Sequence, residues 1–308
     1  MAARYHAGVS VKVGIQLNAI NNPIDSGERF WGVVDACERL GFDSLWLSER
    51  VSGKVPDSLA ALAAMAGRTS RLKFGSSVLV APAYNPVLLA KALATIDVLS
   101  GGRVLPAVGI GQDNPQELEA LGVVKQERGK RLDEAIVLMK RLWTEERVTF
   151  HGAFYNVSEF TVWPRPVGPL PHAMWVGGNS DAAHRRAGRL CDGWLPSSST
   201  PAEIQAGIAA IKAYAAEAGR RIEDDHYGAL MPVSFDAEPS AQLVARRPNV
   251  HPRDYGAFGS TEAMLAQGRR FVEAGAVKLV LFPSVPEDLA QLERLRDEVA
   301  LPLEALPS

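Results

Sequence analysis

A turn at 177–180, "GGNS", has the residue types that bind a phosphate group. It follows the apolar run 173–176 and precedes a helical pattern that begins at Asp181. Glycines allow backbone N–H groups to approach an anion closely, and the N-terminus of a helix adds positive partial charge. The turn therefore predicts an anion site, although a tight turn with a capping Asn or Ser has the same composition.

Small and polar residues also occur in or just after four other apolar runs. They are Ser-Glu-Arg at 48–50, Gly-Ser-Ser at 75–77, "GIGQDN" at 109–114 and "PSSS" at 196–199. Loop residues are often polar for reasons of solvation alone, but five clusters together indicate one site built from several strand ends. The third cluster begins like a dinucleotide fingerprint, yet Asn114 stands where a third Gly is needed, so a Rossmann motif is not predicted.

Short β-type runs alternate with segments of helical period, and this alternation must position the clusters. The runs are 11–17, 44–48, 72–80, 103–109, 173–178, 192–196, 227–235 and 277–282. Between them, apolar residues recur three and four positions apart, as in 27–40 and 86–99. Parallel strands joined by crossover helices produce this pattern, so the predicted fold class is α/β. Eight units predict a (β/α)8 TIM barrel in a single domain over 1–308, with its active site at the carboxyl ends of the strands.

Two segments depart from the simple alternation. Between the fourth and fifth runs, "RVTFHGAFYNV" at 147–157 has two β-type stretches, which predict an inserted hairpin after strand four. The segment 236–256 after the seventh run is rich in Pro, Arg and Ala without a clear period, so we expect a long loop that covers the site as a lid. Helices are expected to begin after Asn85 and Asn114, each of which is followed by Pro, and one is expected to end at Gly41.

Composition argues against several other classes of protein. A formal net charge of −2 and a pI near 6.3 give no reason to expect a nucleic-acid partner. No stretch reaches the roughly 18 apolar residues of a membrane helix, and residues 1–10 lack an apolar targeting region, so we expect a cytoplasmic protein. Cys37 and Cys191 lie far apart, and no His residues are paired as in zinc sites, so neither a disulfide nor a metal site is predicted.

Five segments in this order resemble the luciferase-like monooxygenase superfamily. They are 41–50, 74–104, 107–111, 127–155 and 174–196, and they are most similar to the deazaflavin (coenzyme F420)-dependent oxidoreductases of that superfamily. The resemblance implies an enzyme that transfers a hydride between F420 and a small organic substrate. It also implies a cis peptide bond at Ser77-Val78 in a bulge of the third strand, with Gly75 and its Ser neighbours small because the cofactor approaches the backbone. A plain β-bulge that helps to close the barrel is the alternative.

The same resemblance assigns individual residues to the site. The implied cofactor-binding residues are Ser48, Ser76, Ser77, Val78, Gly109, Gly111, Gln112, Gly177, Gly178, Asn179 and Ser180. Glu49 and Arg50 match the place where related sugar-phosphate dehydrogenases carry an acid and a catalytic His. Because a guanidinium stays protonated, Arg50 can orient or polarise a substrate but is a poor general base. Gln112 replaces the second catalytic acid of those enzymes, so glucose 6-phosphate oxidation is disfavoured and reduction of an activated carbonyl, imine or alkene is favoured.

Two other functions remain open from the sequence. One keeps the fold and uses FMN in a two-component monooxygenase, which needs a separate flavin reductase as partner. The other is a non-catalytic protein that binds flavin or F420, since the His and the second acid are missing. The resemblance also implies a homodimer, packed through the helices at 57–68 and 86–99.

Overall fold

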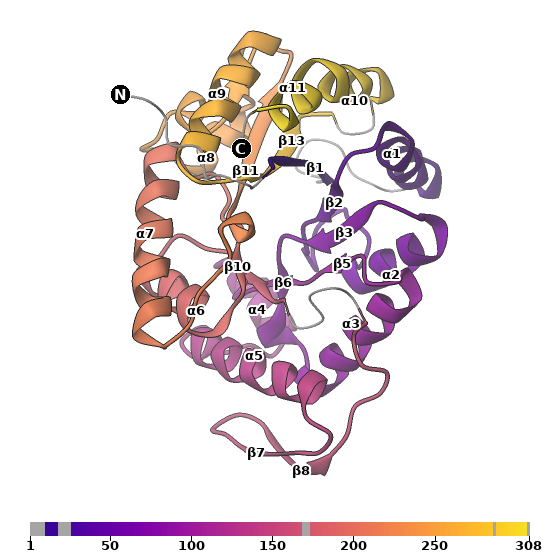
Figure 1. Cartoon of the computed structure of the whole chain (residues 1–308), viewed down its shortest axis with the longest axis vertical. Helices are drawn as coiled ribbons and strands as arrows, with labels where there is room; N and C mark the ends of the chain where they lie inside the picture. Colours follow the sequence, from indigo (N-terminus) through magenta and orange to yellow (C-terminus); the bar gives the residue numbers. More distant parts are fainter. Residues whose placement is uncertain (1–9, 18–25, 168–172, 286–287, 307–308) are drawn as a thin grey trace.

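The computed structural model describes residues 10–17, 26–167, 173–285 and 288–306. Parallel strands lie at its centre, and helices surround them (Figure 1). The strands are β1 (Lys12–Leu17), β2 (Ser44–Leu47), β3 (Lys73–Ser76), β4 (Leu79–Val80), β5 (Val104–Leu105), β6 (Ala107–Gly109), β9 (Trp175–Val176), β10 (Gly193–Trp194), β11 (Gly228–Ser234), β12 (Ala257–Phe258) and β13 (Lys278–Pro283). The α/β class is thus confirmed, and each of the eight expected β-type runs contains a strand.

The described strands form two parallel sheets. A seven-stranded sheet has the order β12-β11-β13-β1-β2-β3-β5, and a four-stranded sheet has the order β10-β9-β6-β4. The third and fourth expected strands are therefore each split in two, at 77–78 and at Pro106, which has no N–H to donate to a ladder. Two isolated parallel bridges, Trp194 to Tyr227 and Ser197 to Leu230, link the region of β10 to that of β11. The parallel α/β arrangement expected for a TIM barrel is thus confirmed, but the described strands form two sheets and not one closed barrel.

Helices cover the outside of the sheets. They are α1 (Gly27–Leu40), α2 (Ser58–Arg68), α3 (Pro86–Ser100), α4 (Pro115–Ala120), α5 (Arg128–Thr144), α6 (Asp181–Leu190), α7 (Pro201–Glu217), α8 (Ala241–Arg246), α9 (Thr261–Glu273), α10 (Leu289–Arg294) and α11 (Leu301–Glu304). The expected boundaries are confirmed where a cap dictates them. Asn85 and Asn114 accept hydrogen bonds from the first turns of α3 and α4, and Gly41 ends α1 with a left-handed φ of 74°.

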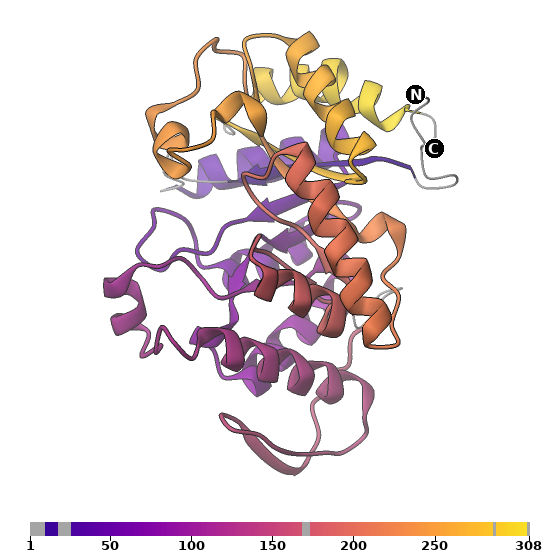
Figure 2. The same cartoon turned by 90° about the vertical axis from the view of Figure 1, so that its left-hand side faces the viewer.

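An antiparallel pair, β7 (Val148–His151) and β8 (Asn156–Phe160), lies between α5 and β9 and projects from the rest of the molecule (Figures 1 and 2). Glu134 of α5 holds its turn, because its carboxylate accepts hydrogen bonds from the N–H groups of residues 153–155. The short helices α4 and α8 project together on one side of the molecule, at the left of Figure 2. Both follow carboxyl ends of strands, so this side is where the site is expected.

The segment 236–256 is more regular than the sequence suggested. It contains α8 and a 3-10 turn, Pro252–Asp254, and the short strand β12 follows it. Ser240 caps α8, Leu243 is buried, and the Tyr255 hydroxyl donates a 2.9 Å hydrogen bond to the carbonyl of Leu243. These contacts pin the helix locally, and they could not be recognised in a stretch too short to show a helical period.

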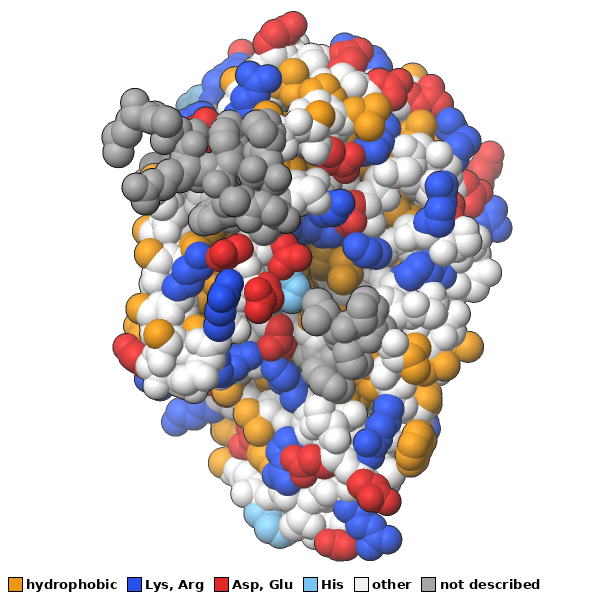
Figure 3. All heavy atoms as spheres, viewed as in Figure 1, with side chains coloured by type: hydrophobic (Ala, Val, Ile, Leu, Met, Phe, Trp, Pro, Cys, Tyr) orange, Lys and Arg blue, Asp and Glu red, His pale blue; other side chains and the backbone are white. Residues whose placement is uncertain are grey.

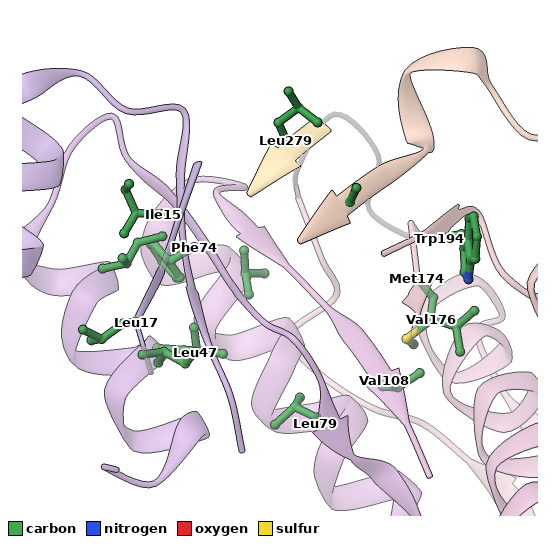
Figure 4. Packing of buried hydrophobic residues seen from close by; sticks show 14 of the residues in the cluster. Ile15, Leu17, Leu47, Phe74, Leu79, Val108, Met174, Val176, Trp194 and Leu279 are labelled. Atoms are coloured by element: carbon green, nitrogen blue, oxygen red, sulfur yellow. The ribbon is translucent and has the colours of Figure 1, made fainter. Parts of the chain in front are cut away.

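Two apolar clusters hold the strands in place. The larger joins strand residues such as Ile15, Phe74 and Val108 to the covering helices (Figure 4). The smaller cluster contains Trp46, Ala107, Trp175, Leu195, Leu230 and Val280, drawn from both sheets. A Cβ at Gly75 would lie 2.2 Å from the carbonyl oxygen of Leu105 and 2.9 Å from the Trp46 ring. Gly75 is therefore small because of this interior packing, which corrects the expectation that a cofactor requires it.

The charged side chains show no large field of one sign on the face in Figure 3, where Lys and Arg lie among Asp and Glu. Within the ranges listed above, no helix is long and apolar enough to cross a membrane. Cys37 and Cys191 are free and buried, and burial raises the pKa of the Cys191 thiol to about 12. Both cysteines are therefore packing residues.

Candidate active site

A cavity of ≈ 200 Å³ lies where the carboxyl ends of the strands meet, and all five polar clusters contribute to it. Its lining residues are Ser48, Glu49, Arg50, Ser77, Val78, Val80, Gly109, Ile110, Gly111, Gln112, Gly177, Gly178, Leu195, Ser197, Leu230 and Arg246. Residues as far apart in the chain as Ser48 and Arg246 thus face one hollow, as the parallel topology requires.

The break between β3 and β4 forms one wall of the cavity. The Ser77-Val78 peptide bond is cis, as the resemblance implied. The Val78 side chain packs against Gly109 and Gly177. A Cβ added at Gly109 would lie 2.4 Å from Val78 Cγ2, and a Cβ added at Gly177 would lie 2.9 Å from Val78 Cγ1. The two glycines are therefore required by Val78, and together they leave bare backbone toward the cavity.

A buried glutamine behind this wall was missed by the sequence analysis. Ser77 donates a 2.5 Å hydrogen bond to Gln16 Oε1, and Gln16 Nε2 donates a 3.0 Å bond to Ser48 Oγ. Gln16 is fully buried on β1, so these bonds satisfy its amide and hold the two serines in fixed orientations. The signal available in the sequence was a Gln inside the apolar run 11–17.

Glu49 is held at the cavity by two donors, one from the end of β4 and one from the segment that follows it. Its carboxylate accepts a 2.5 Å hydrogen bond from the Val80 N–H and another from the Tyr84 hydroxyl. Burial raises the pKa of Glu49 above its ordinary value, and the charges of Asp57 and Glu117 add to this, while the two hydrogen bonds act in the opposite direction. Glu49 therefore holds a proton at higher pH than an exposed glutamate does. Tyr84 was not singled out in the sequence.

Two arginines face the cavity. Arg50 follows β2; its carbonyl accepts a 3.1 Å hydrogen bond from the Gly53 N–H, and its guanidinium forms no hydrogen bond or ion pair with the residues that the structure describes. Arg246, at the end of α8, donates a 3.1 Å hydrogen bond to Ser197 Oγ. Arg246 lines the cavity. Burial and the charge of Arg50 lower the pKa of its guanidinium. A lid was expected at 236–256; that this segment places a cation at the site was not foreseen from the sequence.

The turn at 177–180 is built as the cap of α6. Ser180 accepts a 3.2 Å hydrogen bond from the Ala183 N–H, and the carbonyl of Gly178 accepts a 2.8 Å bond from Trp194 Nε1. The Asn179 side chain bonds to the backbone and side chain of the neighbouring 197–199 turn. Gly177 and Gly178 line the cavity, whereas Asn179 and Ser180 support the turn without lining it.

A buried arginine of α5, Arg128, stabilises the loop after β6. Gly111 has a φ of 75°, and Arg128, which is 8% exposed, donates a 2.9 Å hydrogen bond to the carbonyl of Gln112. This leaves the Gln112 side chain exposed at the cavity. Ser76, another predicted residue, also does not line the cavity. It is fully buried and donates a hydrogen bond to the carbonyl of Ala107, because alternate residues of a strand face opposite sides.

No cluster of three metal-ligating side chains occurs among residues 10–17, 26–167, 173–285 and 288–306. The site therefore consists of one carboxyl group with a raised pKa, two guanidinium groups, several hydroxyls and a glycine-rich wall. These groups can bind an anion, present a flat surface to a ring and move one proton.

Comparison with known proteins agrees with this arrangement. The profile of the luciferase-like monooxygenase family matches residues 9–294. An F420-dependent glucose-6-phosphate dehydrogenase of Nakamurella multipartita is 32% identical over 283 residues, which cover 89% of this chain and 75% of that protein. A protein of the same name from Intrasporangium calvum is 34% identical over 219 residues, covering 67% of this chain and 65% of that protein.

Among solved structures, the monooxygenase RslO1 from Streptomyces bottropensis superposes with a TM-score of 0.79 at 21% identity, over 96% of this chain and 100% of that one. At this identity the likeness shows the fold alone. The family profile spans nearly the whole chain, and a relative above 30% identity is aligned over most of it. The chain therefore belongs to the luciferase-like monooxygenase family.

Proposed function

We propose that this protein is an F420-dependent oxidoreductase that transfers a hydride between the deazaflavin and a small organic substrate. The relatives that are 32% and 34% identical are named for F420 dependence, which supports the choice of cofactor. The observation that carries the proposal is the wall formed by Val78 between Gly109 and Gly177. A Cβ at either glycine would displace Val78 into the space that a flat ring needs.

The residues present fit this cofactor. The backbone at 77–78 and at Gly109 to Gly111 supports the ring, and the turn at 177–180, which caps α6, accepts a phosphate. When bound, F420 supplies or accepts the hydride. The protein contributes the position of the two reactants and their electrostatic surroundings.

Glu49 is the proton donor in this proposal. Its raised pKa lets it carry a proton into the range where exposed glutamates have lost theirs, and Tyr84 fixes the orientation of its carboxyl group. Arg50 and Gln112 stand where sugar-phosphate dehydrogenases of the family carry titrating groups, and neither side chain releases a proton near neutral pH. Reduction of an activated carbonyl, imine or alkene therefore suits this site better than oxidation of glucose 6-phosphate.

We also propose the finer architecture. The strands of both sheets form one (β/α)8 barrel, into which β7 and β8 are inserted, and the segment with α8 covers its mouth. Support comes from the direct succession of β3 and β4 and of β5 and β6, and from the bridges between the β10 and β11 regions. A homodimer through α2 and α3 and a cytoplasmic location stay predictions.

Binding of F420 and FMN, measured side by side on the purified protein by cofactor fluorescence, tests the proposal. We expect F420 to bind at least about tenfold more tightly than FMN, a difference of ~1.4 kcal/mol. The reverse preference would replace the proposal by a two-component FMN monooxygenase, whose oxygen consumption would depend on an added flavin reductase. Tight F420 binding without turnover of any carbonyl, imine or alkene would leave a cofactor-binding protein.

A further inference from the structure

The charges around the cavity are unbalanced. Among the residues that the structure describes, its lining contains two arginines, Arg50 and Arg246, and one carboxyl group, Glu49. Both oxygens of Glu49 already accept hydrogen bonds, one from the Val80 N–H and one from the Tyr84 hydroxyl, and among the described residues Glu49 forms no ion pair with either arginine. The two guanidinium groups are therefore not neutralised by the carboxyl group that shares the cavity with them.

Arg246 and its neighbour Arg247 differ in their partners: Arg247 is paired with a carboxylate, whereas Arg246 is bonded to a neutral hydroxyl. Arg247 forms two 2.8 Å hydrogen bonds to the two carboxylate oxygens of Glu203 and a 2.6 Å bond to the carbonyl of Ser198. The hydrogen bond that the structure shows for Arg246 goes to the neutral hydroxyl of Ser197, at 3.1 Å. The lid thus ties one arginine to a carboxylate of the scaffold and turns the next toward the cavity.

The groups that face these two arginines do not remove the imbalance. Arg50 lies within Coulombic range of Glu117, but no ion pair joins them among the described residues, and Glu117 Oε1 accepts hydrogen bonds from the N–H and hydroxyl of Ser52. The Tyr255 hydroxyl, near Arg246, donates to a backbone carbonyl instead. Arg50 and Arg246 also repel each other, and an anion bound between them would relieve this repulsion.

Topology places Arg50 away from the glycine wall, whereas Arg246 bonds to Ser197, whose carbonyl accepts a hydrogen bond from Asn179 of the 177–180 turn. Arg50 follows β2 and Arg246 belongs to the segment after β11, and in the seven-stranded sheet these two strands are separated by β13 and β1. Gly109 and Gly177 belong to or follow strands of the four-stranded sheet. A ring against the glycines would leave Arg50 free for another molecule, and Arg246, which lines the same cavity, can bind an anion of that molecule as well.

We propose that Arg50 and Arg246 bind an oxyanion, a carboxylate or phosphate, carried by the substrate rather than by the cofactor. The inference rests on the proposed function, because it assigns the anion to the molecule that exchanges a hydride with F420. Two guanidinium groups bind carboxylate and phosphate oxygens through paired N–H donors, which also fixes the orientation of the bound molecule. The site then selects substrates by charge at one end and presents their other end to Glu49.

Inorganic phosphate, acetate and the neutral analogue acetamide are the probes for this site, titrated by calorimetry into F420-loaded protein. We expect phosphate and acetate to bind and acetamide not to. In the Arg50→Gln and Arg246→Gln variants phosphate affinity should fall at least about tenfold, as expected for loss of a charge-assisted hydrogen bond. Arg246→Lys, which keeps the charge, should retain most of the affinity.

Arg221→Gln is the matched control, because it removes one positive charge from a side chain that is 76% exposed and does not line the cavity. Its phosphate affinity should equal that of the wild type. Phosphate affinity unchanged in both Arg50→Gln and Arg246→Gln would overturn the proposal. So would binding of acetamide as tight as that of acetate.

Cofactor affinity separates the two sources of the anion. F420 and its tail-less alcohol, which lacks the phosphate, are titrated into the same variants. We expect both to bind the arginine variants as they bind the wild type. If the arginine variants bind F420 more weakly than the wild type but bind the alcohol equally well, the anion belongs to the cofactor, and the assignment to the substrate is overturned. Wild-type protein that binds phosphate through both arginines but no F420 would leave the oxyanion site standing and refute the proposed function.

Discussion

The Tyr84 hydroxyl donates a hydrogen bond to Glu49, the carboxyl group at the cavity, from a position 35 residues further along the chain. The Val80 N–H donates to the other carboxylate oxygen. β4 and the segment after it therefore fix a side chain that follows β2, across the boundary between the two sheets. Burial raises the pKa of Glu49 and this pair of donors restrains the rise.

Tyr84→Phe should raise the pKa of Glu49 further, because the phenol hydrogen bond favours the ionised form. The folded pKa already lies above the unfolded one, so the stability linked to this proton is present at low pH and is lost as pH rises through the folded pKa. The variant should therefore lose more unfolding free energy at pH 8 than at pH 4.5. Denaturant titrations and carboxyl 13C NMR, assigned with Glu49→Gln, measure both effects.

Tyr214→Phe is the control for that experiment. Tyr214 also donates to a carboxylate, Asp181 Oδ1 at 2.6 Å, but on the exposed surface. Its loss should change stability by less than about 0.5 kcal/mol at either pH. Equal behaviour of the two variants would contradict the assigned role of Tyr84.

Gly109→Ala should block the cavity. The added Cβ would lie 2.4 Å from Val78 Cγ2, so Val78 must move, and overpacking of this kind costs about 1–3 kcal/mol. F420 affinity should fall by at least about tenfold, or ~1.4 kcal/mol, in a fluorescence titration. Gly32→Ala, in the middle of α1 with no atom within 4 Å of its added Cβ, should instead stabilise the fold by about 0.5–1 kcal/mol and leave F420 binding unchanged. Unaltered F420 binding by Gly109→Ala would refute the ring position.

Ser180→Ala and Ser260→Ala form a matched pair. Each serine caps a helix, α6 or α9, with a 3.2 Å hydrogen bond to the N–H three residues on. Both variants should lose about 1 kcal/mol of unfolding free energy. Only Ser180→Ala should also weaken the binding of F420, because only Ser180 belongs to the proposed phosphate-binding turn. Equal F420 affinities in the two variants would remove the turn from the cofactor site.

Glu203→Gln should loosen the lid. Hydrogen bonds from Arg247 lower the pKa of Glu203 to about 2, so its contribution is present above the ordinary glutamate pKa and is lost as pH falls toward about 2. The carboxylate is 42% exposed, which reduces the effect to on the order of 1 kcal/mol. Hydrogen exchange of the α8 amides at pH 7 should accelerate.

Glu293→Gln serves as the control for the lid, since it breaks an exposed pair with Arg39 between α10 and α1. It should leave exchange in α8 as it is in the wild type. If Glu203→Gln exchanges like Glu293→Gln, the Arg247 contact does not hold the lid closed.

The order of strands and helices follows from local sequence. Period-2 and period-3.6 patterns, together with caps such as Asn85 and Asn114, are properties of neighbouring residues, so they predict elements without knowledge of the fold. The polar clusters at the strand ends could be assembled into one site because parallel strands bring their carboxyl ends together. The resemblance to the family added the names of residues within those clusters.

Contacts between distant residues were decided only by the tertiary structure. Gly75 is small because Trp46 and the Leu105 carbonyl lie against it, and Ser76 faces the interior because strand residues alternate. Gln16 and Tyr84 act through partners 61 and 35 residues away, which no local pattern encodes. Arg246 enters the site because Arg247 is tied to Glu203 beside it. Types and spacing of residues thus determined the fold class and the place of the site, whereas packing between separate elements decided which side chains face the cavity and with what charge.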